Sequence, residues 1–146
     1  MSKVFEIGIS DNRKNKIKKV QFVSAVAGKG LLNDRFYKNE NEKSCQLTLI
    51  EKENIDNFNS LLDTNIPYID FRRNIVTTGI SLNGLVGNEI FIGQVKLRVH
   101  ELCEPCKHLQ QMLNQNDLVK NLIHKAGLRC EILTDGKISV NDEITF

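Results

Sequence analysis

The sequence has 146 residues and a formal net charge of +2, with 40% hydrophobic and 26% charged residues. This length fits one domain, which we predict to span residues 1–146, and the composition excludes wholesale disorder. The small net charge gives no support to nucleic-acid or membrane binding through bulk electrostatics. The basic segment 13–19 has no interleaved aromatic residues that could stack on bases, so we predict no nucleic-acid partner.

No hydrophobic run is long enough to span a bilayer, and residues 1–10 lack the basic-then-apolar layout of a signal peptide. We therefore expect a cytoplasmic protein with no membrane partner. Thiols stay reduced in that compartment, so the cysteines are predicted to be free thiols rather than a disulfide framework. The four cysteines are Cys45, Cys103, Cys106 and Cys130.

The first third of the chain predicts three strands. Alternating apolar and polar residues indicate strands over residues 4–10 and 17–27, and the turn chemistry of residues 11–16 predicts that they form a hairpin. Residues 31–44 are polar and predict a loop. Residues 45–52 predict the third strand.

The middle of the chain predicts a short helix and three further strands. The helix is expected from Asn54, where apolar residues recur at helical spacing, until Pro67. The β-branched run Ile75–Thr78 predicts a strand. Residues 89–102 predict two more strands that are joined near Gly93.

The last third predicts a helical region and two strands. Residues 108–126 have an intermittent apolar stripe, divided near Asn114–Asn116, and Gly127 is a natural helix stop. Residues 128–133 and 138–146 predict strands joined by a tight turn. Many short strands, Gly-rich turns and only minor helices predict a mostly β fold, a β-barrel.

The segment CEPC, residues 103–106, carries the clearest chemical signal. Two cysteines three residues apart follow a predicted strand, a spacing that occurs in zinc sites, redox pairs and single-thiolate sites. Lys107 and His108 follow directly, and helical sequence begins there, so both charge and helix dipole favour a thiolate. Cys106 is therefore the candidate reactive residue.

Other interpretations of the cysteines stay open. A structural zinc site could combine Cys103, Cys106, His124 and Cys130, although no second C-x-x-C or H-x-x-x-H supports it. A thioredoxin-type pair calls for an α/β context that the pattern does not show. CEPC could also hold two ordinary loop thiols. Cys45 and Cys130 are predicted to be buried and to act as small hydrophobes.

Arginines form the second candidate site. Arg72 and Arg73 precede Asn74 at the start of a predicted strand, and guanidinium groups match phosphates and flat heterocycle edges. Asp34 is well placed to hold the neighbouring Arg35.

Taken in order, five segments resemble the MOSC domain, the C-terminal domain of molybdenum cofactor sulfurases that also occurs as stand-alone bacterial proteins. The resemblance is strongest over residues 28–146. It implies a mixed β-barrel with a pocket for the molybdenum cofactor (molybdopterin). The segments are GKGLLNDRFY, QLTLIEKENI, FRRNIVTTGISLNGLVGNEIFIGQVKLRV, CEPC and HKAGLRCEILTDGKISVNDEI.

The resemblance also implies roles for individual residues. Cys106 falls on the family cysteine that carries sulfur or ligates molybdenum, whereas less is implied for the first cysteine of the motif. Arg72 and Asn74 fall on an Arg-x-Asn element that faces the pterin and its phosphate. Asp34 and Arg35 fall on the family's Asp-Arg pair. A thiolate suits a soft metal, and arginine donors suit a phosphate.

Three functions follow from these observations. The first is a domain that binds the molybdenum cofactor or carries sulfur on Cys106. The second is a molybdenum-dependent reductase of N-hydroxylated compounds, for which a partner protein donates electrons. The third is a non-catalytic barrel, either structural or stabilised by zinc. The sequence has no counterpart of the pyridoxal-phosphate domain of sulfurases, so we expect neither that cofactor nor internal generation of sulfur, and a partner would donate sulfur.

Overall fold

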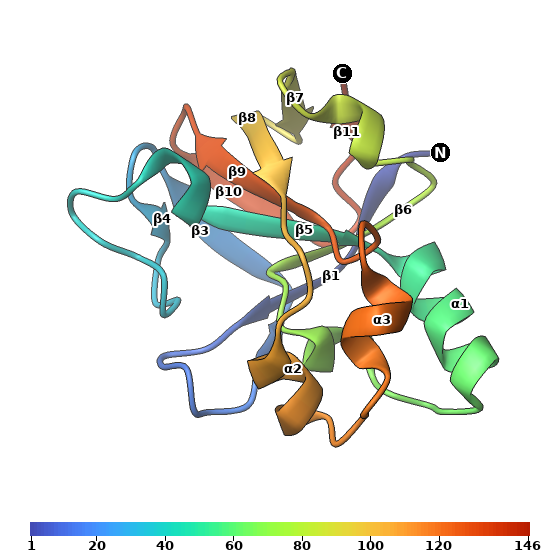
Figure 1. The fold of residues 1–146 in the computed structure, drawn as a ribbon. Coiled ribbons are helices and arrows are strands. Elements are labelled where there is room, and N and C mark those ends of the chain that lie inside the picture. The colour runs from blue at the N-terminus through green and yellow to red at the C-terminus, as the bar shows by residue number, and fades with distance from the viewer.

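The computed structural model describes all residues, Met1–Phe146. It contains eleven strands, three α-helices and three 3-10 helices. The helices α1, α2 and α3 lie on one side of the curled strands (Figure 1). The predicted mostly β fold is confirmed.

The larger sheet has eight strands and is mixed, because β5 and β6 pair in parallel whereas the other neighbours are antiparallel. The sheet curls until β1 meets the segment before β11, where Lys3 bridges Glu143. In spatial order its strands are β11 (Ile144–Thr145), β7 (Glu89–Ile92), β8 (Val95–Leu102), β9 (Leu128–Ile132), β5 (Leu47–Glu51), β6 (Ile75–Thr78), β1 (Lys3–Ile9) and β2 (Lys18–Val20).

The curled larger sheet forms a half-barrel, and a smaller three-stranded sheet adds to it. It consists of β10 (Gly136–Ser139), β3 (Phe22–Val26) and β4 (Gly30–Leu31). The single strand predicted over residues 17–27 is therefore wrong. The chain bends at Gln21, so β2 pairs with β1 in one sheet while β3 pairs with β10 in the other. Val23 and Ala25 are the residues of β3 that enter the core.

The helical segments are short, and their bounds differ from the prediction. The region expected to be helical over 108–126 forms two helices, because Asn114 adopts a left-handed conformation (φ 52°) between them. No helix combines the length and apolar character needed to cross a bilayer. The elements are α1 (Lys52–Leu62), α2 (Lys107–Met112), α3 (Leu118–Leu122), η1 (Lys43–Cys45), η2 (Tyr68–Phe71) and η3 (Asn83–Leu85).

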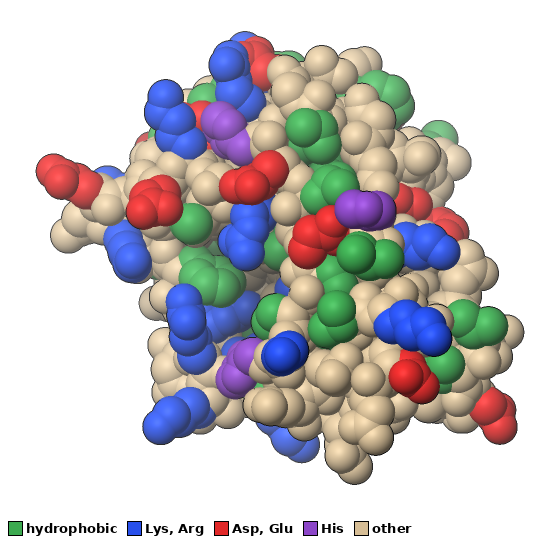
Figure 2. All heavy atoms as spheres, in the orientation of Figure 1, with side chains coloured by type: hydrophobic (Ala, Val, Ile, Leu, Met, Phe, Trp, Pro, Cys, Tyr) green, Lys and Arg blue, Asp and Glu red, His purple; other side chains and the backbone are tan.

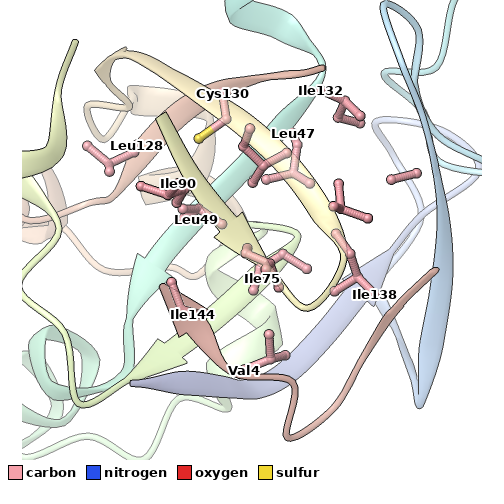
Figure 3. Close-up of a cluster of buried hydrophobic side chains, with 14 of the residues drawn as sticks. Val4, Leu47, Leu49, Ile75, Ile90, Leu128, Cys130, Ile132, Ile138 and Ile144 are labelled. Carbon is pink, nitrogen blue, oxygen red and sulfur yellow. The ribbon is translucent and has the colours of Figure 1, made fainter. Parts of the chain in front are cut away.

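Two apolar clusters stabilise the fold. The larger one fills the space enclosed by the strands, where side chains such as Leu49, Ile75 and Ile138 converge (Figure 3). The smaller one lies between the sheet and the helices and includes Ile50 and Val76. Successive residues of β5 and β6 thus enter opposite clusters, which explains the continuous apolar runs in these strands.

Cys130 in β9 is fully buried in the larger cluster, as predicted (Figure 3). Burial raises the pKa of its thiol, because desolvation disfavours the thiolate, and nearby Cys103 adds to the rise.

The buried thiol makes stability depend on alkaline pH. Above roughly pH 8.5 the Cys130 thiol ionises in the unfolded chain but not in the folded protein. Stability from this group is therefore complete below that pH and is lost as the pH rises, by about 1.4 kcal/mol per unit. Between pH 8 and pH 10, urea denaturation should show wild type losing about 2 kcal/mol more unfolding free energy than Cys130→Ala. Equal losses in the two proteins would contradict this assignment.

Candidate functional site

A cleft of about 710 Å³ opens beside α2. Its wall combines the loop after β1, the loop after β4, η1, the start of β6, the end of β8 and CEPC. In Figure 2, basic side chains gather around a hollow on the side of the molecule that carries β3, β4 and α2 in Figure 1. Only two lining residues, Glu101 and Glu104, are acidic. The basic lining residues are Arg13, Arg35, Lys38, Arg72, Arg73 and Arg129.

Cys106 presents an exposed thiol to this cleft. It occupies the position just before α2, with extended backbone angles (φ −127°, ψ 164°). Cys103 also lines the cleft but is only 3% exposed. The chain from Cys103 to Cys106 has neither turn nor bend. Both are free thiols, the first buried and the second exposed, so the geometry favours a single reactive thiol over a redox pair.

The residues considered for a zinc site do not come together. Cys130 lies in the core, whereas His124 Nδ1 contacts Glu104 Oε2 at 2.6 Å on the surface. No group of three or more His, Cys, Asp or Glu side chains is arranged to hold a metal ion. The proposed set of Cys103, Cys106, His124 and Cys130 is therefore not a zinc site in this fold.

Arg35 and Asp34 form the predicted pair. Arg35 Nη1 donates to Asp34 Oδ1 at 3.1 Å, and both side chains are almost fully buried. Asp34 Oδ1 also accepts the Ser10 backbone N–H. The Arg35 guanidinium lies 4.3 Å from the centre of the Phe36 ring and donates to the Arg72 carbonyl. Asp34 itself does not line the cleft, so it orients Arg35 from behind.

Arg72 enters the cleft from the end of η2, where it adopts a left-handed conformation (φ 64°). Its side chain is 8% exposed and has no carboxylate partner within ion-pair distance. Nη1 and Nη2 donate to the carbonyls of Asn15 and Arg13, at 2.8 and 2.9 Å. Arg72 therefore anchors the basic loop after β1 at the cleft.

Arg73 supports the part of the cleft wall that contains CEPC. Nε donates to the Ala126 carbonyl at 2.8 Å, and Nη2 donates to the carbonyls of Cys103 and Glu104, both at 3.3 Å. This side chain also lacks an ion pair. Its hydrogen bonds fix the start of CEPC against the end of the α3 region.

Burial of these arginines leaves positive charge uncompensated. Burial lowers the pKa of the Arg35 guanidinium; Asp34 opposes this effect, while the charges of Arg72 and Arg73 lower the pKa further. Burial also lowers the pKa of Arg72, against the attraction of Asp34 and Asp70. Guanidinium groups nevertheless stay protonated. The three buried guanidinium groups therefore share one ion-paired carboxylate, that of Asp34, and a bound anion would offset the cost of their burial.

Asn74 lies behind the cleft and does not line it. Its side chain is fully buried; Oδ1 accepts from Thr48 N–H and Thr48 Oγ1, and Nδ2 donates to the Gly8 carbonyl. Asn74 thus joins β1, β5 and β6 at the point where β6 begins. Its placement suits a residue that fixes Arg72 and Arg73, not one that touches a ligand.

The MOSC domain family model matches residues 36–145. The chain belongs to the MOSC domain family. No curated protein matches it, but several solved structures share the fold. The YuaD protein from Bacillus subtilis has a TM-score of 0.84 at 17% identity, covering 99% of this chain and 94% of that chain. YiiM from Geobacillus stearothermophilus has a TM-score of 0.80 at 15% identity, covering 99% and 74%. YiiM from Escherichia coli has a TM-score of 0.70 at 16% identity, covering 99% and 67%.

Several lining residues of this MOSC domain were missed from the sequence. Cys45 was expected to be buried in a strand, but the turn η1 precedes β5 and leaves this thiol half-buried in the cleft wall. Arg129 lies on β9 opposite Thr48 of β5 and Glu101 of β8, so the three side chains share one face. The alternation of LRCEIL marks Arg129 as facing away from the core, but only the strand register brings it to the cleft.

Proposed function

We propose that this MOSC domain binds the molybdenum cofactor, with Arg35 and Arg72 at its phosphate and the Cys106 thiolate at its metal. One observation carries the proposal: buried guanidinium groups with a single carboxylate counterion line a cleft that also presents an exposed thiol. An anion with a soft metal at its other end satisfies both features.

The residues present fit such a group. Arg35 and Arg72 each use two of five N–H donors on protein acceptors, so each keeps three for a ligand. The cleft volume of about 710 Å³ lies in the usual range for cofactor pockets. Asp34 and Asn74 act in this proposal as positioning residues behind the arginines.

When bound, the cofactor would supply redox chemistry at its metal. The residues of the chain would bind and orient it: the arginines fix the phosphate end, and Cys106 holds the metal end. His108 lines the same cleft one residue into α2 and offers an imidazole for proton transfer. A partner protein that delivers electrons or sulfur completes the proposal.

Three alternative functions fit the structure to different degrees. Sulfur transfer on Cys106 is the second candidate, because an exposed free thiol in electropositive surroundings also suits a persulfide carrier. Reduction of N-hydroxylated compounds would use the same cofactor site. A purely structural barrel is disfavoured, because burying several guanidinium groups with only one paired carboxylate costs stability.

The arginine site can be tested without the cofactor. A charge-assisted hydrogen bond contributes roughly 1.5–3 kcal/mol, or ten-fold and more in affinity. Arg35→Gln combined with Arg72→Gln should therefore weaken binding of inorganic phosphate about 100-fold or more, measured by calorimetry at low ionic strength. Arg98→Gln is the matched control, because Arg98 pairs with Glu89 on the surface of β8, outside the cleft. If the double variant kept the phosphate affinity of wild type, the proposed anion site would be wrong.

A further inference from the structure

The two adjacent arginines of the cleft differ in how many donors they have left for a ligand. Arg73 makes four hydrogen bonds to carbonyls, those of Ala126, Phe71, Cys103 and Glu104. Only one of its five N–H donors remains free. Arg72 makes two such bonds and keeps three donors. Arg73 is thus poorly equipped to bind an anion, although it lines the cleft.

We propose that Arg73 is a positioning residue for Cys106. It fixes the carbonyls at the first two positions of CEPC, so that the two following residues bring the Cys106 thiol to the basic cleft. This inference rests on the proposed function, in which that thiol meets a ligand in the cleft, and it assigns the two neighbouring arginines different tasks. Arg72 binds the anion, and Arg73 sets the place of the thiol.

Further contacts hold CEPC in the same orientation. The Cys103 N–H donates to the Gly127 carbonyl at 2.8 Å. The Glu104 carboxylate accepts from the His124 backbone N–H at 2.7 Å and meets His124 Nδ1 at 2.6 Å. Arg73 differs from these contacts because its Nη2 joins two successive carbonyls at once. With the Ala126 and Phe71 carbonyls the guanidinium makes four bonds in fixed directions, whereas a lysine ammonium has only three donors.

A pair of charge-conserving substitutions separates the two tasks. Arg73→Lys and Arg72→Lys each keep one positive charge and lose the fork. Each purified variant is treated with the anionic reagent iodoacetate at one fixed pH, and peptide mass spectrometry follows alkylation of Cys106 and Cys45 separately. Cys45 is an internal control, because it lines the cleft from η1, which Arg73 does not contact. Phosphate affinity is measured on the same samples.

Arg73→Lys should slow alkylation of Cys106 about ten-fold, because release of the segment lets this thiol leave the basic cleft, which attracts the anionic reagent. In the same variant, the alkylation rate of Cys45 and the affinity for phosphate should stay within about two-fold of wild type. Loss of one charged hydrogen bond to phosphate would change the affinity by more than that. Arg72→Lys should do the reverse and lower phosphate affinity about ten-fold with little change at Cys106.

A Cys106 rate that is unchanged or raised in Arg73→Lys would overturn the positioning role, as would equal losses of phosphate affinity in both variants. Failure of Arg72→Lys to weaken phosphate binding would instead count against the proposed anion site and leave the comparison at Cys106 intact. If buried lysine prevents folding, Arg73→Gln and Arg72→Gln repeat the comparison, because a neutral amide costs less to bury.

Discussion

Replacing Gly127 with alanine should leave the protein without a stable fold. Gly127 has φ +105°, and a Cβ atom there would lie 1.7 Å from the Leu49 carbonyl oxygen and 2.8 Å from its carbon. These atoms belong to β5, so no flexible side chain can move aside. We expect the free energy of unfolding to fall by more than about 4 kcal/mol, because losses of this size are typical of strong backbone strain and overpacking.

Gly28 is a control that separates backbone strain from steric overlap with β5 as the cause of the instability. Gly28 has φ +75°, but an added Cβ would meet no atom within 4 Å. Gly28→Ala should therefore cost only the left-handed backbone penalty, about 1–2 kcal/mol. Urea denaturation of both variants gives the comparison. Similar stabilities would show that β5 does not press against Gly127 as described.

The Gly127 junction also matters for the cleft. Its carbonyl accepts the Cys103 N–H, and the preceding Ala126 carbonyl accepts Arg73 Nε. Close approach of this glycine to β5 therefore sets the position of CEPC relative to β6. A destabilised junction should loosen CEPC before the rest of the sheet unfolds, because two of the hydrogen bonds that anchor this region meet at residues 126 and 127.

Cys106→Ser should abolish molybdenum retention while leaving the fold intact. The thiol is exposed and makes no hydrogen bond to the protein, so its loss should change stability by less than about 0.5 kcal/mol. A hydroxyl is a poor ligand for a soft metal. Since loss of a residue that merely supports a ligand costs roughly ten- to 100-fold in metal affinity, loss of the ligand itself should cost at least as much.

Cys45→Ser is the control for this substitution. Cys45 is another thiol of the same cleft, but it lies on η1, before β5, and not in CEPC. Both variants are expressed in cells that make the cofactor. Elemental analysis should then find a lower molybdenum content than in wild type only for Cys106→Ser. Equal molybdenum in the two variants would remove Cys106 from the role of ligand.

The sequence was informative wherever a local pattern determines the structure. Alternation predicts β1 and β9 because each has a defined core face, and Gly127 marks the end of the helical region. The Asp34–Arg35 pair is also local, since the residues are adjacent. Alternation could not reveal the break at Gln21, because the pattern of apolar residues continues from one sheet into the other.

The separate roles of Arg72, Arg73 and Asn74 could not be predicted from the sequence. Three polar residues in a row suggest one shared site, but the left-handed turn at Arg72 sends their side chains to three different places. Arg72 reaches the loop after β1, Arg73 reaches CEPC, and Asn74 reaches β5. Such a division depends on which distant carbonyls lie nearby, and only the assembled fold determines that.

The central claim is that the cationic cleft and Cys106 together hold the molybdenum cofactor. Its most direct test is the molybdenum and pterin content of wild-type protein purified without oxygen from cells that make the cofactor. The account predicts molybdenum and pterin in equal amounts, each approaching one per chain. A protein that carries neither under these conditions, or that carries stoichiometric zinc instead, would contradict it.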